Sequence, residues 1–125
     1  MWIYLNNSFL SIVEKNQDSD TLHIRARKEG DIEAVFPDAD VLATPNGDYK
    51  FRTDIPRGAV AEAMAANINH IDYTDFKSSV EDSERHDVYL DLWSVSHGLE
   101  KPDDEEEPDL LSELGIHFKG PERKR

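Results

Sequence analysis

The sequence predicts an α+β fold: a single two-layer domain with a mainly antiparallel sheet and helices on one face of it. Three observations lead to this prediction. The first half of the chain contains short stretches in which apolar and polar residues alternate, as in half-buried strands. The turn signal Pro45-Asn46-Gly47-Asp48 favours a hairpin, and therefore antiparallel pairing. Residues 57–99 show the apolar spacing of helices, which bury that side against a sheet.

Three strands are expected before residue 30. Residues 2–5 and 9–13 are largely apolar and flank Asn6-Asn7, a pair that tolerates the backbone of a tight turn. A hairpin or a kinked strand is expected there, and without the hairpin the element order has one strand fewer. Residues 21–27 alternate cleanly, which predicts a strand. One of its faces carries Leu22, Ile24 and Ala26, and the other carries His23, Arg25 and Arg27.

A short helix and a second hairpin are expected in the middle of the chain. The helix covers residues 31–36, with Asp31 as its N-cap and Pro37 at its end. Strands over 41–44 and 49–55 follow, joined by the Asn-Gly turn. Alternation in the second strand separates a core set from an open set: Tyr49, Phe51, Thr53 and Ile55 against Lys50, Arg52 and Asp54.

Two longer helices are expected after Pro56, a residue that suits a helix start. The first continues to about residue 70 and is expected to bury Val60, Met64, Ile68 and Ile71. A connector over 72–79 leads to a helix over 84–99, capped by Ser83, with a core stripe of Val88, Leu92, Val95 and Leu99. The aromatic residues of this region are expected to fasten the connector to the helices as core: Tyr73, Phe76, Tyr89 and Trp93.

The composition changes near residue 102, which predicts an α+β domain over 1–101 and an acidic, mostly flexible tail over 102–125. A small apolar island in the tail has the spacing of a short helix. We expect the tail to act as a second contact for a partner. Its candidate contact residues are Asp103, Asp104, Glu105, Glu106, Glu107, Leu110, Leu111 and Leu114.

The charge balance limits the classes of partner that the protein can bind. The chain has 27 acidic and 14 basic residues and a formal net charge of −13. Duplex DNA repels such a protein, so we expect no direct nucleic-acid binding and favour a basic protein partner. The sequence has no cysteine, no signal-peptide pattern and no apolar run approaching the length of a membrane span. A cytoplasmic protein without membrane contact, monomeric or homodimeric, is therefore expected.

The strand pattern also predicts a basic strip on the open sheet face, formed by His23, Arg25, Arg27, Lys50 and Arg52. Like charges on neighbouring strands are unfavourable unless anions offset them. Three sources of the anion stay open: ordinary surface ion pairs, an anionic ligand or partner, and the acidic tail.

Catalytic and metal-binding patterns are weak. Asp72 and Asp75, beside Lys77, are the best candidates for paired carboxylates, but carboxylates are frequent throughout the chain. His86 is expected to cap or pair near a helix start, because no histidine pair has ligand spacing on one helix. Neither a nucleophile motif nor a phosphate-binding glycine loop is present. The sequence therefore favours a protein without enzymatic activity, metal or cofactor.

Several short motifs carry a family resemblance: Ile24–Arg27 (IRAR), Asp48–Arg52 (DYKFR), Ile71–Lys77 (IDYTDFK), and His86, Tyr89 and Trp93 in the pattern H-x-x-Y-x-x-x-W. Together with SIV at Ser11–Val13 and GDIE at Gly30–Glu33, they resemble a family of small, uncharacterised bacterial or phage-borne proteins. The similarity covers roughly residues 2–99. It implies a bacterial or phage-borne intracellular protein but no activity, substrate or cofactor. The positions that it shares with the site candidates are Arg25, Arg27, Tyr49, Arg52, Asp72, Lys77 and His86.

The leading hypothesis is a non-enzymatic acidic interaction or regulatory protein that binds another macromolecule. A phage or mobile-element inhibitor of a nucleic-acid-binding host complex would fit this description. The alternative is a small-anion or nucleotide-binding domain, catalytic or not, that uses the basic sheet face. A third hypothesis is an accessory protein that dimerises through a sheet edge near residues 1–5.

Overall fold

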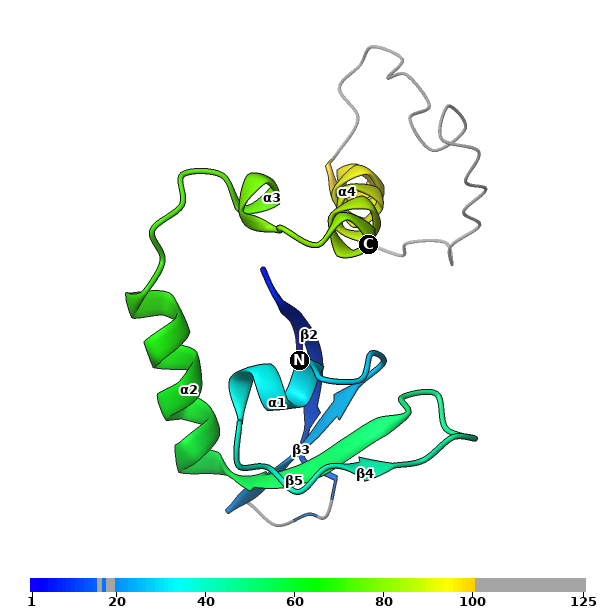
Figure 1. Ribbon diagram of the computed structural model, residues 1–125, viewed down its shortest axis with the longest axis vertical. Helices are drawn as coiled ribbons and strands as arrows, with labels where there is room; N and C mark the ends of the chain where they lie inside the picture. The colour runs from blue at the N-terminus through cyan, green and yellow to red at the C-terminus, as the bar shows by residue number, and fades with distance from the viewer. Residues whose placement is uncertain (16, 18–19, 101–125) are drawn as a thin grey trace. The chain divides into compact units, whose positions relative to one another are not determined.

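The computed structural model describes residues 1–15, 17 and 20–100. They divide between two compact units, Met1–Asp82 and a second that begins at Ser83. Among these described residues, the first unit contains the sheet and helices α1 to α3, and the second contains helix α4, which continues into a 3₁₀ turn (Figure 1). The predicted α+β class is confirmed.

The elements follow the predicted order. The strands are β1 (Trp2–Leu5), β2 (Ser8–Val13), β3 (Thr21–Ala26), β4 (Leu42–Ala43) and β5 (Phe51–Pro56). The helices are α1 (Asp31–Val35), α2 (Arg57–Asn69), α3 (Phe76–Ser79), α4 (Ser83–Ser96) and the 3₁₀ helix η1 (His97–Leu99).

The five strands form one antiparallel sheet in the order β1-β2-β3-β5-β4. The N-terminal hairpin is real, with Asn6-Asn7 in its turn and Ile3 opposite Leu10. The chain's ammonium group extends this ladder by donating to the backbone oxygen of Ile12 at 2.8 Å. Short connections account for the antiparallel β1–β2, β2–β3 and β4–β5 pairs. The β3–β5 pair is also antiparallel, although α1 and β4 lie between these two strands in the sequence.

One face of the sheet holds the core. Leu10, Ile12, Ile24 and Ala26 are buried there against α1 and α2 (Figure 1). The alternation predicted for β3 and β5 is confirmed on this face, since it also carries Leu22, Phe51 and Ile55. The two helices contribute Ile32, Phe36 and Val60. Burial of these side chains is the main favourable term in the stability of this unit.

The start of α1 differs from the prediction. Gly30, with a φ of 93°, is the N-cap, and Asp31 is the first helical residue. A left-handed φ favours glycine because it has no Cβ. The Asp31 carboxylate is buried and accepts the backbone N–H of Phe9 at 2.9 Å. The β2–β3 ladder ends at Ser11 and Arg25, so Asp31 supplies an acceptor beyond the end of the strand pairing.

The core stripe predicted for α2 is right for its first half only. Val60 is buried, and Met64 packs against the core. Ile68, by contrast, is 67% exposed, and Ile71 beyond the helix is also exposed. The helix is longer than the part of the sheet face that it covers, so its last turn extends past the core.

The second unit corrects the predicted stripe of the last helix. Tyr89 is the buried residue of α4, whereas Val88 and Leu99 are exposed. Leu92 and Val95 are half-buried, so the predicted stripe is right for these two residues and wrong for Val88 and Leu99. Trp93, expected in the core, is 51% exposed and makes an edge contact with the His97 ring at 4.7 Å.

The boundary predicted at 101 and 102 and all of the predicted tail contacts lie outside the described residues. Within the described ranges, the structure contains no helix that is both long enough and apolar enough to cross a membrane.

Candidate functional site

The open face of the sheet, opposite the core, carries a row of side chains that runs across four strands. Directly opposed residues of antiparallel strands point to the same face. The register therefore aligns Trp2 on β1, Ser11 on β2, Arg25 on β3 and Arg52 on β5. Three of the predicted site residues gather close to this row, around a fourth, Tyr49.

Tyr49 is the centre of this group. The guanidinium carbon of Arg25 lies 4.5 Å from the centroid of the Tyr49 ring, and that of Arg27 lies 4.3 Å from it. Arg52 donates from Nε to the backbone oxygen of Tyr49 at 3.1 Å. The Tyr49 side chain is buried beneath these cations, which favours stacking because the attraction strengthens away from water. We call Arg25, Arg27, Tyr49 and Arg52 the tyrosine–arginine cluster.

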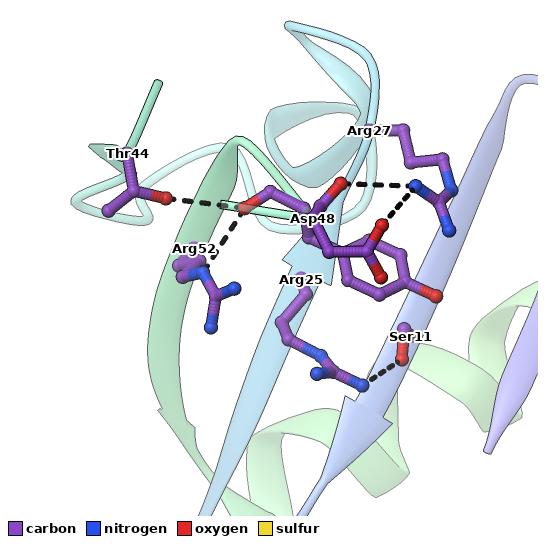
Figure 2. Close-up of polar contacts among 7 residues, drawn as sticks. Ser11, Arg25, Arg27, Thr44, Asp48 and Arg52 are labelled. Carbon is purple, nitrogen blue, oxygen red and sulfur yellow. Dashed lines mark hydrogen bonds and ion pairs between the residues drawn. The ribbon is translucent and has the colours of Figure 1, made fainter. Parts of the chain in front are cut away.

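Local hydrogen bonds orient the cluster (Figure 2). Arg25 donates from Nη2 to the Ser11 hydroxyl at 2.7 Å, and Arg27 donates from Nη1 to the Asp48 carboxylate at 3.0 Å. The hydrogen bond to Asp48 raises the pKa of Arg27 further above its ordinary value. The predicted repulsion between opposed arginines is therefore moderated by the aromatic ring and by Asp48.

The placement of Tyr49 corrects the predicted β4–β5 hairpin. Strand β5 begins at Phe51 rather than at Tyr49, and residues 45–50 form a loop. The Thr44 N–H closes this loop by donating to the backbone oxygen of Lys50 at 2.6 Å. Tyr49 therefore leaves the strand alternation that predicted it on the core face. Gly47 permits the close packing of the loop, because a Cβ there would lie 3.3 Å from Arg52 Nη2.

His23 does not extend the predicted basic strip as an exposed cation. It is buried, and its Nδ1 lies 2.9 Å from Oδ1 of Asp54, the residue opposite it on β5. Among the described residues, His23 Nε2 and Arg25 Nε are buried without a hydrogen-bond partner. Buried polar atoms of this kind are rare in native proteins. Lys50 lies in the loop and is exposed.

An aromatic patch lies beside the cluster and was not predicted from the sequence. Trp2, Tyr4 and Phe9 share the open face of the β1–β2 hairpin. Tyr4 stacks on Phe9 with centroids 4.3 Å apart, and Trp2 meets Phe9 edge to face at 6.4 Å. The pKa of Tyr4 is raised, mainly because the side chain is partly buried and also because Tyr49 lies near it, whereas the positive charge of Arg27 lowers it. The influence of Tyr49 and Arg27 on Tyr4 indicates that the patch adjoins the cluster. The alternation of Trp2 and Tyr4 was the available signal, but it needed a fixed hairpin register.

The remaining predicted site residues are not brought together. Asp75 is the N-cap of α3 and accepts the Ser78 hydroxyl at 2.6 Å and the Lys77 N–H at 3.3 Å. The Ser78 hydrogen bond is the main reason that the pKa of Asp75 is lowered. A carboxyl group of this kind is a poor general acid near neutral pH. His86 belongs to the second unit, where its Nδ1 lies 3.9 Å from the Asp87 carboxylate.

Asp72 instead lines a pocket at the end of α2, which we call the α2 groove. Its volume is about 220 Å³. The apolar and aromatic part of its lining consists of Ile3, Leu5, Met64, Ile68, Ile71 and Tyr73. Its polar lining consists of Asn6, Asn67, His70 and Asp72. The groove thus joins exposed apolar surface to a carboxylate, and its lining contains no lysine or arginine.

Within residues 1–15, 17 and 20–100, the structure places no three His, Asp or Glu side chains close enough to hold a metal ion.

Comparison with known proteins yields no match. Protein-family models, curated proteins and solved structures were compared with the chain, and none matches it. The family resemblance expected from the motifs therefore stays a prediction.

Proposed function

We propose that this protein is a non-enzymatic interaction protein that binds a basic, partly apolar segment of a partner protein in the α2 groove. The observation that carries the proposal is the exposure of Ile68 and Ile71 beside the Asp72 carboxylate. Contiguous apolar surface with a polar rim is typical of interaction sites on soluble proteins.

Charge selects the class of partner. The chain carries a net charge of −13, and the only side chain of the groove lining that can become positive is His70. A lysine or arginine of the partner would pair with Asp72 while a neighbouring apolar side chain covers Ile68 and Ile71. Basic surfaces are common on proteins that bind nucleic acid. Occupying such a surface would inhibit nucleic-acid binding, a regulatory role that would fit the charge of the chain.

Site-specific photo-crosslinking tests the proposal. A photoreactive residue replaces Ile68 in the full chain, and a matched variant carries it at Glu62, an exposed position on the same helix. In an extract of the native host cell, we expect an adduct from position 68 and none from position 62. Adding Asp72→Lys should abolish the adduct, because it places a cation where the partner's cation binds.

The purified partner then gives a quantitative test. We expect its Kd to rise with salt concentration, since screening weakens attraction between opposite charges. Equal crosslinking from both positions, or an adduct that persists after Asp72→Lys, would contradict the proposed site.

A further inference from the structure

The open face combines a surface for stacking with guanidinium groups, and the α2 groove uses neither. Trp2 is 67% exposed, and its ring meets that of Phe9 at a steep angle. An aromatic ring that is two-thirds exposed keeps surface accessible for stacking with a planar ligand.

The cations lie within reach of Trp2. Trp2 and Arg25 occupy the same cross-strand row, separated only by Ser11 on β2. Neighbouring strands are about 4.8 Å apart, so the two backbone positions lie about 10 Å apart. The Arg25 side chain extends towards β2, because its Nη2 donates to the Ser11 hydroxyl at 2.7 Å.

The guanidinium groups retain unused donors. An arginine side chain has five N–H donors. Arg25 donates from Nη2 to Ser11, and Arg27 donates from Nη1 to Asp48. The Arg25 Nε–H is buried, so only the terminal nitrogens of Arg25 can reach a ligand. The Arg27 side chain is 53% exposed, so an anion in solution can approach its guanidinium group.

We infer that the open face binds a nucleoside monophosphate, with the base stacked on Trp2 and the phosphate held by Arg25 and Arg27. Every nucleobase has a planar face that stacks on aromatic side chains. The planar fork of arginine matches the oxygens of a phosphate group. The ligand would complete donors that the fold leaves without protein acceptors.

The charge of the chain favours binding of a mononucleotide over binding of a nucleic-acid strand. Each further phosphate of a strand would extend beyond the cluster over a protein whose net charge is −13. Repulsion then grows with strand length, whereas a single phosphate needs only the local cations. The face therefore fits one nucleotide, and this inference does not depend on the groove or on its partner.

Fluorescence titration tests the inference on the full chain. Trp93→Phe leaves Trp2 as the only tryptophan, so emission reports on the open face. We expect AMP at low salt to quench this emission saturably. Adenosine and inorganic phosphate, which each supply half of the contacts, should bind at least about tenfold more weakly.

Two variants assign the two halves of the ligand. Arg27→Gln should weaken AMP binding about tenfold, while Arg57→Gln, a matched loss of one exposed arginine on α2, should leave it unchanged. Trp2→Leu, followed by calorimetry, should weaken AMP binding without affecting inorganic phosphate. Trp2 and Arg27 are both well exposed, so neither change should unfold the chain.

Three outcomes would overturn the inference. The first is the absence of saturable quenching by AMP. The second is equal weakening by Arg27→Gln and Arg57→Gln, which would show an effect of overall charge alone. The third is tighter binding of a short single-stranded oligoadenylate than of AMP, which would assign the face to nucleic-acid strands.

Discussion

The guanidinium carbon of Arg27 lies 4.3 Å from the centroid of the Tyr49 ring, and Arg25 approaches the same ring at 4.5 Å. Tyr49 comes from the loop between β4 and β5, whereas both arginines belong to β3 or to its end. The ring therefore joins the loop to the middle of the sheet. Because it is buried, its contribution should appear as stability of the whole first unit.

Tyr49→Ala should lower the free energy of unfolding by about 3 to 5 kcal/mol, the range for removing a buried aromatic side chain. Tyr49→Phe keeps the ring and should cost about 1 kcal/mol or less. Urea unfolding followed by circular dichroism measures both. A Tyr49→Ala protein as stable as the wild type would show that the loop does not depend on this ring.

Asp31 links α1 to β2 through the Phe9 N–H, at 2.9 Å. Asp31→Ala leaves that N–H without its acceptor and should destabilise the protein by about 1 to 3 kcal/mol. Asp31→Asn retains an oxygen that can accept the same hydrogen bond, so its loss should be smaller. Amide hydrogen exchange at Phe9 provides a local readout, with faster exchange expected in Asp31→Ala than in Asp31→Asn. The same exchange rate in both variants would exclude this hydrogen bond as the source of the effect.

The sequence predicted the fold correctly in segments whose structure depends on local patterns such as strand alternation. Alternation placed Leu22, Ile24 and Ala26 on the core face, and the register confirms it. The predicted position of Tyr49 was wrong because the alternation of the strand was extended into a loop. The length of that loop depends on contacts such as the hydrogen bond between Thr44 and Lys50. Those contacts are set by tertiary packing, which overrides local patterns.

The candidate site shows the same division. The open-face positions of Arg25 and Arg52 follow from period-two alternation alone. The aromatic patch required the pairing of Tyr4 with Phe9 across the hairpin, and the pairing of His23 with Asp54 required the β3–β5 register. Periodicity shows which side of an element a residue occupies but not which strand lies beside it.

Two positions on α2 test where the helix leaves the sheet. Val60 is buried in the core, whereas Ile68 is mostly exposed. Val60→Ala should cost about 2 kcal/mol, from lost burial and the cavity that it leaves. Ile68→Ala should change stability by less than about 0.5 kcal/mol, as expected for an exposed site. Thermal unfolding of both variants checks the difference, and equal losses would mean that the whole helix is packed.

Asp75 provides a test of pH dependence. Its pKa is lowered in the folded chain, first by the Ser78 hydroxyl. The stabilisation from the charged carboxylate is therefore fully present above the unfolded pKa of about 3.9. It is lost as the pH falls through the lower folded pKa, when the proton weakens the contacts to Ser78 and Lys77. Amide signals of these two residues, followed by NMR during acid titration, should show a midpoint below about 3.9. Asp75→Asn should remove this titration because its side chain does not ionise. A wild-type midpoint at or above the ordinary value would contradict the hydrogen-bonded cap.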